Sequence, residues 1–171
     1  MSNILTEEGA MNTEGEFGKQ IVQDLILPAT HSKPEIMERY ARFGRRIHWI
    51  DSNVVPGAFQ MNTSWYYKPT TFMLDGPTNA VTTPHKHDVD EILGFYGSNP
   101  DDPYDLGGEI ILYINGEKHT LTKSSLVFLP SGMEHLPLIV TKVDRPILHF
   151  SIVMEDTYRY TSADGTLHEA K

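Results

Sequence analysis

Hydrophobic and polar positions follow two different periodicities along this chain, and the first is that of a helix. Just before residue 45, apolar residues recur three and four positions apart, which is typical of an amphipathic helix. Ser32 can cap its first turn, Pro34 suits that turn, and Glu35 stands three residues after Ser32 as in a capping box. The apolar face consists of Ile36, Met37, Tyr40, Ala41 and Phe43. The pattern predicts one helix early in the chain.

Glycine and positive charge mark the end of this helix. Gly44 is placed where a left-handed residue can end it. Arg45 and Arg46 come next and suit the negative end of the helix dipole.

Beyond Arg46 the rhythm changes to short apolar runs separated by turn residues. The chain has 13 glycines and 11 prolines, and they punctuate this part. The Asn115–Gly116 pair between two apolar runs predicts a two-residue type I′ hairpin. The predicted strands cover Ile47–Ile50, Gln60–Tyr67, Thr70–Leu74, Glu91–Tyr96, Glu109–Ile114, Lys118–Leu121, Ser125–Leu129, Leu136–Thr141 and Ile147–Met154. The fold class is therefore all-β, an antiparallel sandwich or barrel with one N-terminal helix.

Composition narrows the function. A chain of 171 residues, 39% of them hydrophobic, is sufficient for one folded domain. It has no cysteine, which excludes disulfides and thiolate chemistry, and no apolar run of the roughly 18–20 residues that a transmembrane helix needs. Twenty-three acidic against 14 basic residues give a net charge of −9, which excludes nucleic acid as the main partner. With no basic and apolar leader at its start, we expect a cytoplasmic protein without a membrane contact.

Two histidines and a glutamate lie close together in the segment 83–92. If this segment is extended, His85, His87 and Glu91 point to the same side. Imidazole nitrogens and one carboxylate oxygen are a donor set that suits a divalent metal ion. The alternative is a solvated turn that merely exposes both histidines.

A third histidine follows a tight turn some forty residues later. Pro130 ends an apolar strand, Gly132 permits the reversal, and His135 opens the next strand. A lone histidine in such a place is usually structural, but as a fourth donor to the first three it would complete a metal site.

The two segments together resemble the two-part signature of the cupins. The resemblance extends from about Thr70 to Met154 and implies a jelly-roll barrel of six to eight strands. It also implies one metal ion in the interior, with His85, His87, Glu91 and His135 as ligands.

The donor set ranks the candidate metals. Three imidazoles alone suit zinc, copper, iron or nickel, and the carboxylate moves the preference toward manganese and iron. We rank Mn or Fe first, and then Zn or Ni. Four protein ligands around an octahedral ion leave two positions for water or a substrate.

Three further residues are candidates for the site. His149 alternates with apolar neighbours in the last predicted strand, so it can be a second-shell residue or general base, or alternatively a core histidine. Trp65 and Tyr66 lie in an aromatic strand that suits a substrate-binding wall, and alternatively a subunit contact or the core.

We expect four segments: a flexible arm over 1–18, the helix and accessory strands over 19–69, the cupin barrel over 70–155 and a tail over 156–171. The predicted function is a metal-dependent cupin enzyme, active as a homodimer on a small oxygenated molecule such as a keto or hydroxy acid, a phenolic or a sugar-like compound. Isomerase, lyase or hydrolase, and dioxygenase chemistry all fit such a site. The alternative is a non-catalytic module that binds or senses a small ligand.

Overall fold

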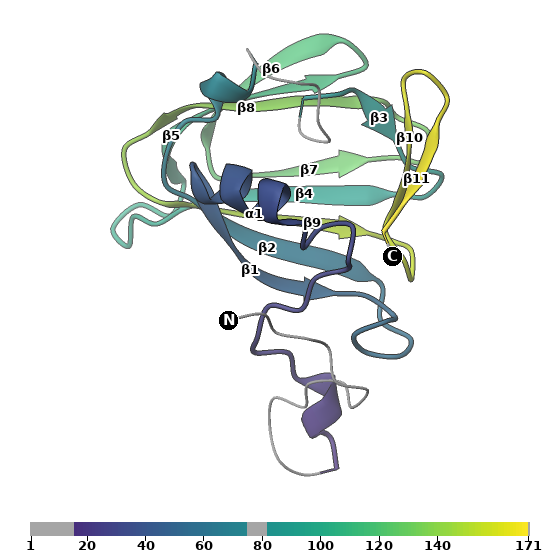
Figure 1. The fold of residues 1–171 in the computed structure, drawn as a ribbon. Helices are drawn as coiled ribbons and strands as arrows, with labels where there is room; N and C mark the ends of the chain where they lie inside the picture. The colour runs from purple at the N-terminus through teal and green to yellow at the C-terminus, as the bar shows by residue number, and fades with distance from the viewer. Residues whose placement is uncertain (1–15, 75–81, 171) are drawn as a thin grey trace.

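Two antiparallel β-sheets make up most of this molecule (Figure 1). The structure is a computed structural model and describes residues 16–74 and 82–170. One sheet has five strands in the order β1-β2-β9-β4-β7, and the other has six in the order β11-β10-β3-β8-β5-β6. The strands are β1 (Gly44–Ile50), β2 (Gln60–Tyr66), β3 (His85–Lys86), β4 (Glu91–Gly97), β5 (Asp105–Ile114), β6 (Glu117–Lys123), β7 (Ser125–Leu129), β8 (His135–Val143), β9 (Ile147–Val153), β10 (Arg159–Ser162) and β11 (Leu167–Glu169).

The strand order is that of a jelly roll. The four strands β2-β9-β4-β7 belong to one sheet and β3-β8-β5-β6 to the other, so the chain crosses repeatedly between the sheets. Eight strands in two facing antiparallel sheets define this architecture. The sheets remain separate ladders, so the barrel is not closed. The all-β prediction with one N-terminal helix is confirmed, since α1 (Pro34–Ala41) is the α-helix of the described residues.

The hydrophobic core lies between the sheets because inward and outward side chains alternate along each strand. In β4, for example, Leu93 and Phe95 are buried whereas Tyr96 is exposed. Both sheets contribute buried side chains to the core, among them Leu129, Ile147, Val153, Ile110, Leu112, Leu138 and Val140. In Figure 1 helix α1 lies in front of the space between the sheets, and the hairpin β10–β11 stands at one end of it.

The predicted strands overlap observed strands with one exception. The Asn115–Gly116 turn is confirmed, with φ values of 47° and 78°. The prediction of a strand over Thr70–Leu74 is wrong, because Thr71–Met73 forms the short 3-10 helix η2. Thr70 alone bonds to the neighbouring strand: its N–H donates to the Val140 carbonyl (2.8 Å), and its hydroxyl accepts from the Val140 N–H (2.9 Å). These two hydrogen bonds of Thr70 stand in place of the series of backbone hydrogen bonds that a strand would form there.

Both ends of α1 differ from the prediction. Lys33 is the N-cap without a side-chain cap bond, and the Ser32 hydroxyl instead donates to the Ala29 carbonyl at 3.3 Å. Gly44 does not adopt a left-handed conformation but begins β1. A Cβ there would lie 2.5 Å from the Trp65 carbonyl oxygen, so glycine is required for close strand approach.

The structure describes part of each terminal segment. Most of the expected arm, residues 1–15, lies outside the described residues, and Gly18–Gln20 forms the 3-10 helix η1. The expected tail after residue 155 contains β10 and β11, and β10 pairs with β3. Likewise β1 and β2, placed among accessory strands by sequence, pair into the sheet that holds β9. Within the described part of the chain, no helix has the length and apolar character needed to span a bilayer.

Candidate metal centre

Two of the candidate ligands are cross-strand neighbours. His85 opens β3 and His135 opens β8, and these two residues pair directly in the antiparallel register. Their ring centroids are 4.5 Å apart. Facing residues on one side of an antiparallel pair are close enough for such contact, so the sheet itself brings the two sequence motifs together.

The other two candidates come from the crossing between the sheets. The segment from His85 to Glu91 is not extended throughout, because β3 ends at Lys86 and the chain bends before Glu91 opens β4 in the opposite sheet. His87 and Glu91 are nevertheless each only 3% exposed and point inward. The bend carries the carboxylate across to the histidines.

The turn of the second motif is bonded to this bend. Gly132, at φ +80°, donates its N–H to the His87 carbonyl at 2.8 Å. Ser131 donates its N–H to Asp90 Oδ1 at 2.9 Å and its hydroxyl to the Asp88 carbonyl at 2.8 Å. Residues far apart in sequence thereby hold both motifs in one position.

Three of the four candidate side chains converge on one point, and the fourth lies against two of them. One nitrogen from each of His85, His87 and His135 lies within 4.8 Å of the others. Glu91 Oε2 lies 3.0 Å from His135 Nε2 and 3.3 Å from His87 Nε2. All four residues are buried, with 2–3% exposure.

Backbone carbonyls orient two of the rings. His87 Nδ1 contacts the Arg159 carbonyl, and His135 Nδ1 lies 3.3 Å from the Met133 carbonyl. A carbonyl oxygen only accepts, so each Nδ1 bears the proton and each Nε2 lone pair is left for the centre. His85 Nδ1, His87 Nε2 and Glu91 Oε2 are buried without a hydrogen bond. Buried polar atoms in this condition fit a divalent cation, which would satisfy all of them.

Charge within the cluster matches that of a metal site. Burial, together with the neighbouring His135 and His87, lowers the pKa of His85 to about 3. Burial opposes ionisation of Glu91, but contacts with His135 and His87 outweigh it and lower the Glu91 pKa to about 2. Burial also opposes protonation of His87, yet its contact with Glu91 raises the His87 pKa overall. At neutral pH the cluster therefore offers a neutral His85 and an ionised Glu91, the forms that bind metals.

Both halves of the two-part signature thus meet between the sheets of a jelly roll. The fold is a jelly roll. No protein-family model and no curated protein sequence matches the chain. Similar solved structures include KdgF from Halomonas sp. (15% identity, 66% of this chain and 79% of that chain, TM-score 0.37). Others are a double-stranded β-helix protein from Klebsiella pneumoniae (11%, 75% and 85%, TM-score 0.41) and a cupin from Bacteroides fragilis (16%, 63% and 75%, TM-score 0.38). Likeness at this level carries no information about chemistry.

His149 lies on the inner wall of the jelly roll and is not one of the three converging histidines. Its Nδ1 lies 3.1 Å from the Gly94 carbonyl, and its ring stacks on Phe95 (centroids 4.8 Å apart) and Tyr66 (5.3 Å). Burial lowers the His149 pKa to about 4, so the ring is neutral at pH 7. His149 faces the same inner cavity as Glu91.

The two aromatic candidates separate. Tyr66 is buried and lines the inner cavity. Trp65, the adjacent residue of the same strand, points to the opposite face of the sheet, across from Leu148 in β9. It is not among the side chains that line the inner cavity.

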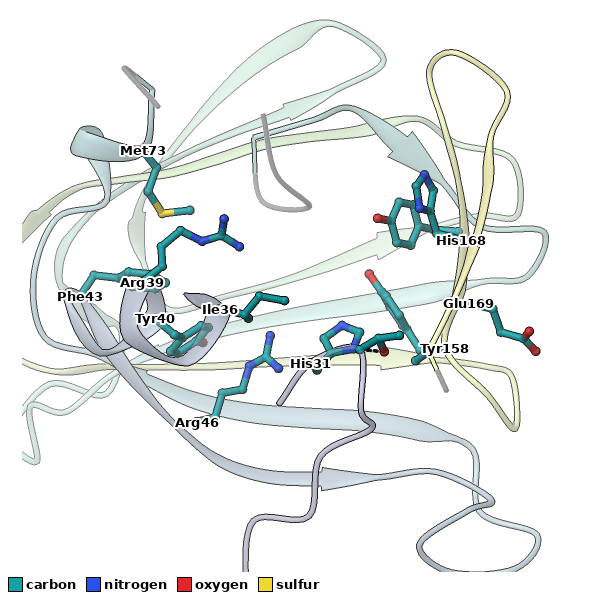
Figure 2. Close-up of a pocket in the computed structure, with 13 residues that line it drawn as sticks. His31, Ile36, Arg39, Tyr40, Phe43, Arg46, Met73, Tyr158, His168 and Glu169 are labelled. Atoms are coloured by element: carbon teal, nitrogen blue, oxygen red, sulfur yellow. Dashed lines mark hydrogen bonds between the residues drawn. The ribbon is translucent and has the colours of Figure 1, made fainter. Parts of the chain in front are cut away.

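Two adjoining cavities give access to the cluster, and sequence reasoning missed several of their walls. The inner one, of about 120 Å³, is lined by Glu91, His85 and His135, and the outer one has about 380 Å³. Four side chains line both, namely His31, Tyr40, Arg46 and Tyr158. Figure 2 shows them converging from α1, β1 and the loops. Arg46, expected at the helix end, lies on β1, and His31, which the sequence gives no reason to select, packs on Trp49.

Proposed function

We propose that this chain is a metal-dependent cupin enzyme that binds a small oxygenated molecule between its sheets. The convergence of three histidine nitrogens and the Glu91 carboxylate, with polar atoms buried and unbonded, beside a cavity is the observation that supports it. The proposed ligands are His85, His87, His135 and Glu91. Hard and borderline donors in this proportion favour Mn or Fe over Zn or Ni.

The bound ion would supply Lewis acidity toward the oxygen atoms of the substrate. The chain's own residues hold and enclose the reactant. The carbonyls of Met133 and Arg159 fix the imidazole tautomers, and Tyr66 forms part of the cavity wall. Because its Nδ1 must donate to the Gly94 carbonyl, His149 keeps an unprotonated Nε2, so we propose it as the general base.

The test begins with metal analysis of the purified protein and of His87→Ala. We expect one divalent ion per chain in the wild type and none in the variant. The metal-loaded protein is then assayed against hydroxy and keto acids, phenolics and sugars, with dioxygen uptake recorded in parallel. A wild type that binds no divalent ion refutes the proposal, and a loaded protein that binds but never converts these compounds points instead to a non-catalytic binding module.

A homodimer in the cytoplasm remains part of this proposal. The outer face of the five-stranded sheet supports the dimer, because it presents exposed apolar side chains from β4, β7 and the end of β9. These are Tyr96, Leu126, Phe128 and Met154. Large contiguous apolar faces of this kind are typical of subunit contacts, and sedimentation of the wild type against Leu126→Ser tests the pairing.

A further inference from the structure

Arg46 carries a positive charge into the cavity without a matching negative charge. It projects from β1 and lines both the inner and the outer cavity. Its Nε and Nη1 are buried and have no hydrogen-bond partner. In residues 16–74 and 82–170, the ion pairs of arginine with a carboxylate involve Arg145 and Arg159, and Arg46 has none.

Aromatic rings hold the guanidinium in place but do not neutralise it. Its central carbon lies 4.8 Å from the Tyr40 ring centroid and 6.0 Å from that of Trp49. The Tyr40 phenol is also a hydrogen-bonding neighbour, yet it is uncharged. Cation–π contacts orient an arginine, whereas buried N–H groups still require acceptors.

The acidic groups around the cavities are already engaged or face away. Glu91 contacts His87 and His135. Glu169 is exposed on the hairpin β10–β11, and Figure 2 shows its carboxylate directed away from Arg46. The charge of Arg46 acts across the cavity as well: after burial, it is the second cause that lowers the His31 pKa to about 4. Arg46 therefore brings a positive charge to a cavity whose lining carboxylate, Glu91, already contacts two histidines, in a protein of net charge −9.

We infer that the ligand of this cavity is a small carboxylic acid whose carboxylate binds Arg46. The guanidinium group is the side chain best matched to carboxylate oxygens in partly desolvated sites. This rests on the proposed function for the far end of the ligand, where the histidine cluster lies. It narrows that function, since hydroxy, keto and sugar acids fit whereas neutral phenolics and neutral sugars leave Arg46 without a counter-charge.

The experiment compares acids with uncharged partners of the same shape. Glycolate, lactate and glucuronate are titrated into the full-length protein by calorimetry, beside glycolamide, lactamide and glucose, and inorganic phosphate serves as a separate anion arm. We expect the acids to bind at least about 10-fold more tightly than their partners, because hydrogen bonds to charged groups contribute more than those to neutral ones. Tighter binding of phosphate than of any acid would assign the site to a phosphorylated ligand and overturn the carboxylate assignment.

Two arginine variants locate the effect. Arg46→Gln should weaken acid binding about 10- to 100-fold. Arg45→Gln is the matched control, since Arg45 is the adjacent residue, is exposed and does not line either cavity. Metal content and melting temperature are measured for both variants, and Arg46→Lys is used if Arg46→Gln fails to fold.

The outcomes separate this inference from the proposed function. Loss of acid binding in Arg46→Gln with unchanged metal content supports the inference. Equal binding of acids and their partners by the wild type, no acid binding at all, or unchanged binding by Arg46→Gln overturns it. A wild type that holds no metal but still binds acids through Arg46 refutes the proposed metal function alone.

Discussion

Four buried histidines lie on the inner walls of the jelly roll, and the surroundings of His149 differ from those of the other three. His149 lies between Phe95 and Tyr66 and bonds to the Gly94 carbonyl. His85 and His87 of the cluster also pack against rings, those of Tyr160 and Tyr158, but the three cluster histidines converge on one another. Their rings approach one another and a buried carboxylate, and some of their polar atoms are left without bonds.

Burial alone therefore does not identify a metal ligand in this molecule. Both groups are inaccessible, and burial lowers the pKa of both His85 and His149. What distinguishes the cluster is convergence on one point together with an acidic oxygen. A stacked histidine with its Nδ1 bonded needs no cation, whereas converging donors without hydrogen bonds fit one.

The largest effect separates the two groups directly. We expect His87→Ala to weaken divalent-metal binding by more than about 100-fold, because removal of a direct ligand exceeds the loss of an outer partner. His149→Phe, which keeps an aromatic ring against Phe95, should retain metal affinity within about 3-fold by the same reasoning. Titration calorimetry with Mn²⁺ or Zn²⁺ measures both. Equal losses in the two variants would show that the distinction drawn here is wrong.

The dependence of stability on pH tests the burial of His149. The pKa of His149 is about 4 when folded and about 6.5 when unfolded. Between these values the unfolded chain binds a proton that the folded chain does not, so stability falls as the pH decreases from 6.5 to 4. We expect His149 to lower the free energy of unfolding by about 3 kcal/mol between pH 6.5 and pH 4, at about 1.4 kcal/mol per pH unit.

Urea unfolding of the metal-free protein at pH 7 and at pH 4 measures this cost. His31, whose pKa is also lowered to about 4, contributes a fall of its own in both proteins. The difference between the wild type and His149→Phe isolates His149. An identical fall in the two proteins would mean that His149 is not held neutral by burial.

The carboxylate has the next smaller effect. Glu91→Gln keeps the shape of the side chain but removes its negative charge, and we expect metal affinity to fall about 10- to 100-fold. Glu117→Gln is the matched control, since Glu117 is exposed, lines neither cavity and contacts His119 at 3.9 Å. Inductively coupled plasma analysis after dialysis against a chelator gives the retained metal. Equal retention in both variants would remove Glu91 from the ligand set.

The sequence was sufficient to select the side chains that gather in the cluster, but not the rest of the cavity. His85, His87 and Glu91 lie within one short segment, so their spacing is visible without a fold. The crossing of that segment between sheets was not visible, because it depends on the pairing of His85 with His135 in one sheet and of Glu91 with Leu129 in the other. Trp65 and Tyr66 were chosen together, yet adjacent strand residues face opposite sides, and only the observed register shows which one points inward.

Residues brought in by distant elements gave no local signal. The sequence predicts Arg46 at the C-terminal end of the helix. The structure places it on β1 instead, and that position depends on pairing with Ser64 in β2, which no local pattern shows. Tyr158 follows the last predicted strand and reaches the cavity because β10 pairs with β3. Contacts between residues far apart in the sequence leave no pattern of spacing or periodicity. The side chains that line the cavity are therefore the part of the site that the sequence predicts least well.

The smallest predicted effect concerns the turn that joins the two motifs. Ser131→Ala removes the hydroxyl that donates to the Asp88 carbonyl at 2.8 Å, while the backbone bond to Asp90 remains. An exposed neutral hydrogen bond contributes about 0.5–1.5 kcal/mol, so metal affinity should fall only about 2- to 10-fold. Ser125→Ala is the control, because its hydroxyl donates at 2.7 Å to the Lys123 carbonyl without touching the bend. If Ser131→Ala loses stability like Ser125→Ala but keeps full metal affinity, the turn supports the fold without positioning His87. A loss of metal affinity in Ser131→Ala but not in Ser125→Ala would instead show that the contact between the two motifs holds the three histidines together. His149, whose Nδ1 bonds to the Gly94 carbonyl within its own sheet, does not depend on that contact.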